Sequence, residues 1–157
     1  AIDSGSTAIE LAQVLRERFH TLTIVTNSPE VFEMLYPVEG FEPIQTGGFY
    51  MKSERAFYGY ITVDTLRGLH VSKSLIFPSA ISLQHGVGVY VPELLEVERA
   101  LMEIADETIL LADSSKFETT GALKLCDLKS IHRLVTDGDL SDAVYRLYAE
   151  AGVPILR

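Results

Sequence analysis

The stretch Thr108-Ile109-Leu110-Leu111-Ala112 decides the fold class, because it is a short run of almost wholly apolar residues. A β-strand with apolar side chains on both faces is typical of a parallel sheet that helices cover on either side. The run at residues 131–136 resembles it. We therefore expect both runs to be strands of a parallel sheet, and the first to be buried on both faces.

Strand and helix patterns alternate through the rest of the chain. One predicted strand ends at Ile2. The others span residues 22–26, 41–45, 74–78, 108–112, 131–136 and 153–156. The predicted helices span residues 8–19, 56–66, 93–107 and 141–151, and another begins at Pro29 with Ser28 as its N-cap. Residues 79–92 are expected to form a loop, because Gly86 and Gly88 mark backbone that needs freedom. The alternation predicts one α/β domain, residues 1–157, with an open, mainly parallel sheet and helices on both faces.

The charge balance argues against two classes of partner. Asp and Glu outnumber Lys and Arg by 22 to 13, which gives a formal net charge of -9, and no basic cluster reverses this field locally. Such a field repels nucleic acid and anionic membranes. Charged residues, Gly or Pro interrupt every apolar run before it reaches membrane-spanning length, and no signal-peptide pattern opens the chain.

Cys126 is the only cysteine, so no intrachain disulfide can form. This fits a reducing compartment, and we expect a cytoplasmic protein in which Cys126 is a small buried apolar residue rather than a reactive thiol. The chain begins at Ala1, two residues before a polar loop. We therefore expect a fragment that lacks whatever preceded its opening strand.

Polar or flexible residues follow four of the predicted strands. Ligands of open parallel sheets bind in the crevice beyond the carboxyl ends of the strands, so these segments are expected to form one rim. They are Asp3-Ser4-Gly5-Ser6-Thr7, Thr26-Asn27-Ser28, Thr46-Gly47-Gly48 and Asp113-Ser114-Ser115-Lys116.

The opening loop is the most informative of the four. Gly5 allows close approach of the backbone to a ligand, Ser6 and Thr7 offer hydroxyl groups, and the helix that follows adds free N–H groups at its positive end. Together these groups suit a phosphate or carboxylate. The alternative is that Ser6 or Thr7 merely caps the helix. Asp3 would repel a phosphate, so we expect it to accept hydrogen bonds from ligand hydroxyls.

Lys116 is the natural partner charge for such an anion, since its ammonium follows a buried strand as a compact point charge. A surface salt bridge with Asp113 is the alternative. His20, His70, His85 and His132 have no metal-ligand spacing, and His85 is expected to be a solvated loop residue. Residues 137–139 are interpreted as a turn, and Glu93, Glu96 and Glu98 as the solvated face of a helix. We expect no metal, no cofactor and no catalytic residue.

Five motifs in this order resemble one known family. They are Asp3-Ser4-Gly5-Ser6-Thr7, Val25-Thr26-Asn27-Ser28, Gly47-Gly48, Leu110-Leu111-Ala112-Asp113-Ser114-Ser115-Lys116-Phe117 and Leu134-Val135-Thr136-Asp137. The chain resembles, nearly end to end, the C-terminal effector-binding (sensor) domain of DeoR-family bacterial transcriptional regulators. The first and fourth motifs are the most specific.

The resemblance implies a fold similar to that of ribose-5-phosphate isomerase and the CoA transferases. It also implies a domain, usually of a repressor, that senses a phosphorylated sugar or related metabolite and forms homo-oligomers. In that family an N-terminal winged helix-turn-helix binds DNA, and this segment is absent here. The phosphate and effector site is then expected along the rim described above and at one further residue. Its residues are Asp3, Ser4, Gly5, Ser6, Thr7, Thr26, Asn27, Ser28, Gly47, Gly48, Ser79, Asp113 and Lys116.

Two positions depart from the usual family pattern. Pro78-Ser79-Ala80-Ile81-Ser82 stands where many members have a Gly-Ala-x-Gly-Ile-type segment, and Leu94 and Glu98 stand where a Glu and a Lys are usual. Since both positions could face the ligand, the effector is expected to differ from the commonest sugar phosphates. A degenerate pocket is the alternative.

The resemblance leaves an enzymatic alternative, because the isomerases share the Ser/Thr-rich loop and the late Ser-Lys. Their proton transfer needs a positioned carboxylate base. The strand end at residues 78–82 has no carboxylate, and Gln45-Thr46-Gly47-Gly48 has no lysine. We therefore predict binding without turnover. A purely structural oligomerisation domain is a third possibility.

Overall fold

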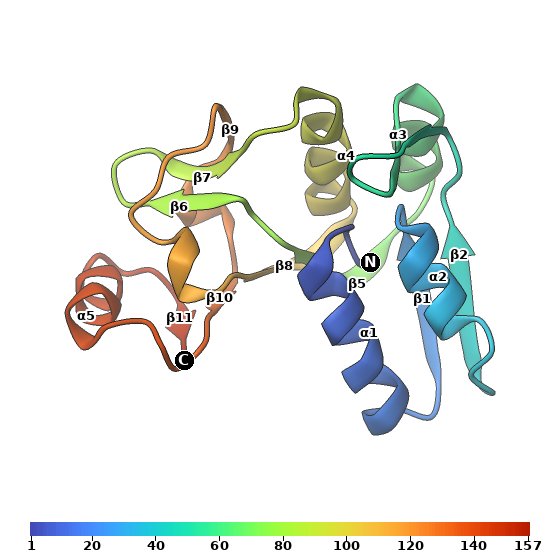
Figure 1. Cartoon of the computed structure of the whole chain (residues 1–157), viewed down its shortest axis with the longest axis horizontal. Helices are drawn as coiled ribbons and strands as arrows, with labels where there is room; N and C mark the ends of the chain where they lie inside the picture. Colours follow the sequence, from blue (N-terminus) through green and yellow to red (C-terminus); the bar gives the residue numbers. More distant parts are fainter.

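The computed structural model describes residues 1–157 and contains one central parallel sheet (Figure 1). Its strands are β1 (Leu22–Thr26), β2 (Phe41–Gln45), β5 (Val71–Ile76), β8 (Ala105–Leu111), β10 (Arg133–Val135) and β11 (Ile155–Leu156). Hydrogen bonding gives two groups, β11-β10-β8-β5 and β1-β2, and all their pairings are parallel. Ile2 joins them, because it bridges Thr26 of β1 and Leu75 of β5 in parallel.

The opening segment therefore lies in the middle of the sheet. The N–H of Ile2 donates to Val25 O at 2.9 Å, and the N–H of Asp3 donates to Leu75 O at 3.0 Å. From Ile2 the chain first adds β1 and β2 on one side and later adds β5, β8, β10 and β11 on the other. Strand order thus reverses at Ile2, and in open α/β sheets a crevice forms at such a switch point.

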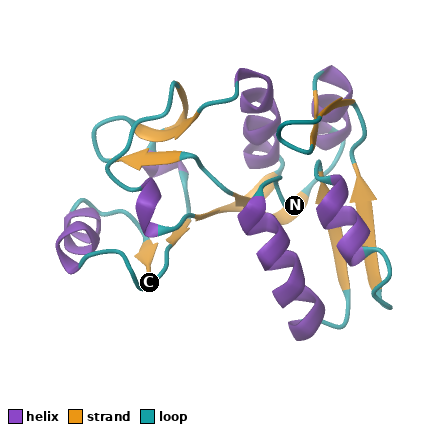
Figure 2. Cartoon of the chain, viewed as in Figure 1, coloured by secondary structure: helices purple, strands orange, loops and turns teal.

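Helices cover both faces of this sheet (Figure 2). They are α1 (Ser6–Arg18), α2 (Pro29–Leu35), α3 (Tyr60–Arg67), α4 (Pro92–Glu103) and α5 (Asp142–Glu150). Helices α1 and α2 pack side by side, as do α3 and α4. Successive residues of β1 enter different cores, Ile24 beside α1 and α2, and Val25 in the larger cluster with α3, α4 and α5. Alternation of this kind is what a sheet covered on both faces requires.

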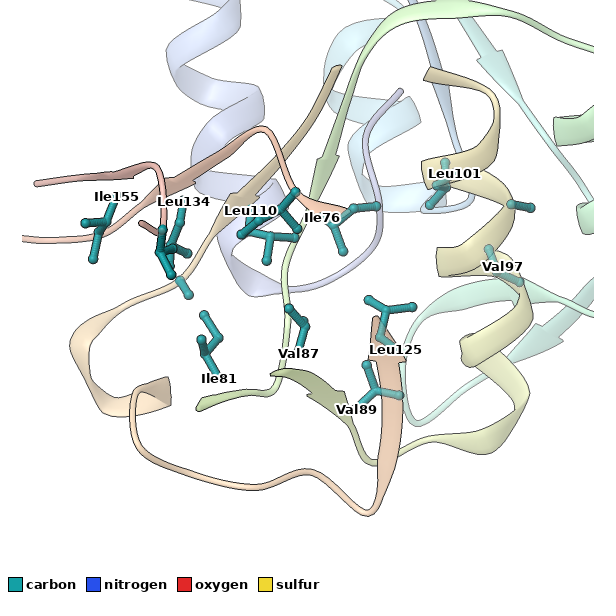
Figure 3. Close-up of a cluster of buried hydrophobic side chains, with 14 of the residues drawn as sticks. Ile76, Ile81, Val87, Val89, Val97, Leu101, Leu110, Leu125, Leu134 and Ile155 are labelled. Atoms are coloured by element: carbon teal, nitrogen blue, oxygen red, sulfur yellow. The ribbon is translucent and has the colours of Figure 1, made fainter. Parts of the chain in front are cut away.

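Two small antiparallel sheets flank the central one. The first pairs β3 (Phe49–Met51) with β4 (Ala56–Tyr58). The second has the order β6-β7-β9, from β6 (Ala80–Ser82), β7 (Gly86–Val89) and β9 (Leu123–Cys126). Figure 3 shows that side chains of this second sheet, together with Val97 and Leu101 of α4, face Ile76 and Leu110 of the central sheet across one apolar core.

Most predicted elements are confirmed with shifted ends, but two predictions are wrong. Residues 56–66 are β4 followed by α3, because Gly59 at φ +88° turns the chain between them. Residues 79–92 are not a loop but the β6-β7 hairpin. Glycine in this segment serves strand packing, since a Cβ on Gly88 would lie 2.8 Å from Gly121 N.

Three further corrections concern α4 and β8. The predicted helix 93–107 ends at Glu103, and β8 begins at Ala105. In the stretch 108–112, buried residues alternate with half-buried ones, so full burial holds for one face of the strand only. Glu98 is wrongly assigned to the solvated face of its helix, because it is only 6% exposed.

Candidate functional site

A cavity of about 280 Å³ lies at the carboxyl edge of the central sheet. Four chain segments form it, namely those that follow the opening segment, β5 and β8, and Tyr90, which follows β7. Their lining residues are Gly5, Ser6, Thr7, Phe77, Pro78, Ser79, Tyr90, Leu111, Ala112, Asp113 and Lys116. The sheet topology brings the first three of these segments together, because the ends of parallel neighbours meet at one edge. The cavity therefore lies at the switch point of the fold.

The first turn of α1 opens toward this cavity without a cap. Gly5 is the N-cap residue, with φ +131°, and no side chain caps the helix. The alternative that Ser6 or Thr7 caps α1 is therefore wrong. The first-turn N–H groups remain without a side-chain partner at the positive end of the helix dipole, an arrangement that suits an anion.

Lys116 provides the cationic side chain of the same cavity. It ends the short 3₁₀ helix η1 (Ser114–Lys116) and is half-buried. It forms no ion pair with Asp113, whose carboxylate instead accepts hydrogen bonds from the N–H and the hydroxyl of Ser115. These bonds, and then the charge of Lys116, hold the pKa of Asp113 below its ordinary value. The Lys116 ammonium is thus available to a ligand.

A second cavity, of about 250 Å³, adjoins the first and shares Gly5, Ser6, Phe77, Ser79 and Tyr90 with it. Its remaining lining residues are Asp3, Ser4, Glu54, Val89, Val91, Leu94 and Glu98. None of them is a lysine, an arginine or a histidine. The two cavities therefore differ in charge. The first holds Lys116 together with Asp113, whereas the second holds the acidic side chains Asp3, Glu54 and Glu98 and no cation.

Asp3 and Glu98 dominate the acidic end. Asp3 is 3% exposed, and its Oδ1 accepts the Ser4 N–H at 2.7 Å. Burial raises the pKa of Asp3, and the Ser4 N–H and the Asn27 side chain offset only part of that rise. Burial, and then the charge of Asp3, raise the pKa of Glu98. Glu98 Oε2 is buried without a hydrogen-bond partner.

The sequence placed Leu94 and Glu98 at positions that could face a ligand, and both line this cavity. Glu54 and Tyr90 were not predicted as site residues. Glu54 lies in the turn between β3 and β4, and Tyr90 follows β7, two elements that the sequence pattern did not reveal. No local signal marked either one.

The strand end after β1 has a different character. Thr26, Asn27 and Ser28 are buried but line neither cavity. Thr26 Oγ1 accepts the Ser28 N–H at 3.0 Å, and Ser28 Oγ accepts the Val31 N–H at 3.3 Å, so Ser28 caps α2 as predicted. Asn27 donates to Phe57 O at 3.4 Å and so ties β1 to the β3-β4 hairpin. These side chains organise the turn.

Gly47 and Gly48 also lie outside both cavities. Gly47 O accepts the Thr62 hydroxyl at 2.7 Å, and a Cβ on Gly48 would lie 2.1 Å from Thr62 Oγ1. The two glycines thus allow β2 to approach α3. Their predicted contact with an effector stays a prediction, as does that of Thr26, Asn27 and Ser28.

The remaining features add no chemistry to the site. Residues 137–139 form a turn in which Asp137 accepts the Ser114 and Asp139 N–H groups. No set of three or more His, Cys, Asp or Glu side chains is placed to hold a metal ion. Cys126 is half-buried, and burial raises its pKa to about 12, so its thiol stays protonated at neutral pH. None of the helices has the length and apolar character needed to cross a bilayer.

Comparison with known proteins places these features in a family. Residues 1–138 match the family described as "DeoR C terminal sensor domain". Over 99% of its length the chain is 30% identical to a protein of Escherichia coli O157:H7 that is named as a transcriptional repressor for the aga operon. It is 34% identical over 85% of its length to the HTH-type transcriptional repressor GlcR of Bacillus subtilis, and 31% identical over 90% to the L-fucose operon activator of Haemophilus influenzae.

The chain spans 57%, 52% and 56% of the lengths of these three relatives. All three names are those of transcription regulators and not of enzymes. The family match covers most of the chain, including the opening loop, Glu98 and Lys116. The chain therefore belongs to the family of DeoR C-terminal sensor domains.

Proposed function

We propose that this domain senses a phosphorylated sugar or a related phosphorylated metabolite at the two adjoining cavities. The observation that carries the proposal is the convergence of the uncapped α1 N-terminus and the unpaired Lys116 on one cavity. Free N–H groups and a compact ammonium together bind a phosphate at close range, even on a protein with a net charge of -9. The adjoining cavity then holds the rest of the metabolite.

The sugar part of the proposal rests on two supports. The acidic cavity offers carboxylate and hydroxyl groups, which suit a ligand with several polar hydrogens. In addition, one relative is named for the L-fucose operon, and L-fucose is a sugar. Asp3 directly follows the opening strand segment and lines the acidic cavity. There it accepts hydrogen bonds from the ligand rather than contacting its phosphate.

The effector acts on DNA binding by a helix-turn-helix that lies outside this chain, in a regulator that is a repressor working in the cytoplasm. Support comes from the relatives, which are transcription regulators and are nearly twice as long as the matched segment. The acidic charge of the domain itself is unfavourable for DNA, so a separate basic segment must supply that contact. Ligand binding shifts the regulator between two states only if the two states differ in their affinity for the ligand.

The isomerase-like alternative deserves a separate test, because Asp3 and Glu98 place carboxylates beside the cavity although residues 78–82 supply none. A carboxyl group with a raised pKa is suited to proton transfer. The family is one of regulators, and we assign both carboxylates to binding. Incubation with ribose 5-phosphate and related pentose and hexose phosphates should give no isomerised product above background. Turnover that disappears in Glu98→Gln would overturn this assignment.

A thermal-shift screen of phosphorylated sugars tests the main proposal. A ligand at 100 times its dissociation constant adds about 2.7 kcal/mol to the free energy of unfolding, which raises the melting temperature by several degrees. At least one sugar phosphate should do so, and the matching unphosphorylated sugar should not. If no phosphorylated metabolite raises the melting temperature, the domain is better explained as a structural oligomerisation module.

We also propose that the domain assembles as a homo-oligomer. Its support is an exposed aromatic cluster in which the rings of Phe49 in β3 and Tyr60 at the start of α3 contact each other, and Phe49 also contacts Tyr58 in β4. Exposed aromatic clusters mark interaction surfaces more often than isolated apolar residues do. Light scattering on the purified domain should give a mass above that of a single 17.4 kDa chain. A monomer at all concentrations would contradict this.

A further inference from the structure

Glu98 is the most unusual side chain of the site. It is on α4, is only 6% exposed and lines the acidic cavity. One of its carboxylate oxygens, Oε2, is buried without a hydrogen-bond partner. A carboxylate removed from water is costly unless a cation or hydrogen-bond donors compensate it. No basic side chain lines this cavity. The free protein therefore contains a buried acid whose partner is missing.

Asp3 increases this imbalance. It is also buried and lines the same cavity, and its charge disfavours ionisation of Glu98. Two carboxylates that face one small space repel each other unless one of them keeps a proton. Glu54 adds a third acidic side chain at the exposed rim. Such a space is suited to a positive charge.

We propose that the effector carries an amino group, and that Asp3 and Glu98 bind its ammonium at the end of the site opposite Lys116. This rests on the proposed function, because the phosphate of the same molecule occupies the cavity at Lys116 and the α1 N-terminus. The two cavities share five lining residues, so one small molecule spans both. A site with one cationic and one acidic end matches a ligand with the opposite arrangement, namely a phosphorylated amino sugar.

Two other occupants of the acidic end fit less well. A divalent cation takes six or more oxygen ligands, or four in the case of zinc, and no group of three acidic or metal-binding side chains is placed to supply them. A sugar hydroxyl can donate one hydrogen bond but brings no charge, so one carboxylate would stay protonated or repelled. An ammonium brings three donors and a full positive charge to the two carboxylates.

Matched pairs of ligands test the inference by isothermal titration calorimetry at pH 7. Glucosamine 6-phosphate is compared with glucose 6-phosphate, and galactosamine 6-phosphate with galactose 6-phosphate, so that each pair differs only at the amino group. N-acetylglucosamine 6-phosphate adds a ligand whose nitrogen is in the same position but carries no positive charge. In at least one pair the amino sugar phosphate should bind tenfold or more tightly than the partner that lacks the amino group, and than the acetylated form.

Two variants assign that preference to the buried acids. Glu98→Gln should reduce the preference for the amino sugar phosphate by tenfold or more. It should leave the affinity for the sugar phosphate without an amino group unchanged or improved. Glu93→Gln, on the exposed part of the same helix, should leave both affinities unchanged. A preference that persists in Glu98→Gln would overturn the role given to this residue.

The outcomes separate the inference from the proposed function. If sugar phosphates bind but no amino sugar phosphate binds more tightly than its partner without the amino group, the inference is wrong and the phosphate site stands. If no sugar phosphate binds, with or without an amino group, both the inference and the proposed function are wrong. Equal affinity for glucosamine and glucosamine 6-phosphate would contradict the assignment of the phosphate to the end at Lys116.

Discussion

The two strand ends at residues 3–7 and 26–28 look alike in sequence but differ in what their polar groups do. Each follows a central strand and precedes a helix. After β1, Ser28 Oγ caps α2 by accepting the Val31 N–H, and Thr26 Oγ1 accepts the Ser28 N–H. At the opening segment, Gly5 occupies the cap position of α1 and has no side chain to offer.

The difference shows how one residue at a cap position separates a structural turn from a binding site. A Ser cap satisfies the first-turn donors of its helix from within the chain, whereas a Gly cap leaves them open to an external acceptor. The opening strand end also lies at the switch point between β1 and β5, where a cavity forms. Open donors beside a cavity can bind an anion, and satisfied donors in a packed turn cannot.

Removing Lys116 should have the largest effect, and it should act on binding alone. Lys116→Ala should weaken the affinity for a sugar phosphate at least tenfold, because a hydrogen bond to a charged group contributes about 1.5–3 kcal/mol. The free energy of unfolding should change by no more than about 0.5 kcal/mol, since the side chain forms no ion pair in the free domain. Calorimetric titration and thermal melts measure the two quantities.

Lys129→Ala is the matched control, because Lys129 is exposed, lies in the other 3₁₀ helix, η2 (Leu128–Ser130), and lines neither of the two cavities. It should leave the affinity unchanged. Equal losses in both variants would contradict a direct contact between Lys116 and the phosphate, because they would show that any loss of positive charge weakens binding equally.

Glu98→Gln should change stability rather than phosphate affinity. Burial raises the pKa of Glu98 and of Asp3 in the folded state, so the folded state binds more protons than the unfolded state above about pH 4. The free energy of unfolding of the unliganded domain should therefore fall as pH rises from about 4 toward neutrality. Glutamine carries no charge, so the variant should lose part of this slope.

Near neutral pH the variant should be about 1–3 kcal/mol more stable than the natural sequence, which is a rise of several degrees in melting temperature. Near pH 4 the two should melt at similar temperatures. The other titratable groups near the pair, Glu54, Tyr90, Cys126 and the Ala1 amino group, are common to both proteins and do not change the comparison. Parallel pH profiles would contradict a buried carboxyl group with a raised pKa at Glu98.

Ser28→Ala should have the smallest effect, and it should act on stability alone. Loss of the Ser28 cap costs about 1 kcal/mol, which lowers the melting temperature by about 2–4 °C. The affinity for a sugar phosphate should not change, because Ser28 lines neither cavity. Weaker binding without loss of stability would show that the strand end after β1 also contacts the ligand, as the sequence alone predicted.

The sequence predicted much of the fold because the central strands are apolar and their helices carry clear start signals. Ser28-Pro29 fixed the start of α2, and the strands at residues 22–26 and 41–45 were placed to the residue. The β6-β7 hairpin was missed because its glycines suggest a loop, whereas they are needed where two backbones pass closely. Such contacts join residues that are far apart in sequence, so no local pattern reveals them.

The candidate site was predicted in part for a similar reason. The opening loop and Lys116 were identified because strand ends in parallel sheets meet at one edge. Glu98 was taken for a surface acid, since its helix carries several glutamates and only packing decides which of them is buried. The one indication in the sequence was that Glu98 stands where the family usually has a Lys. Its role could be inferred only once the structure showed the cavity and the position of Asp3.

Amide chemical shifts during a titration with a sugar phosphate test the central claim most directly. A ¹⁵N-labelled domain titrated with glucose 6-phosphate or glucosamine 6-phosphate should show saturable shifts at the Ser6 and Thr7 amides, whose donors are open. The Val31 amide, which Ser28 already satisfies, should stay in place. Shifts at Val31 with none at Ser6 and Thr7 would contradict the account, because they would place the phosphate at the capped helix instead of the open one.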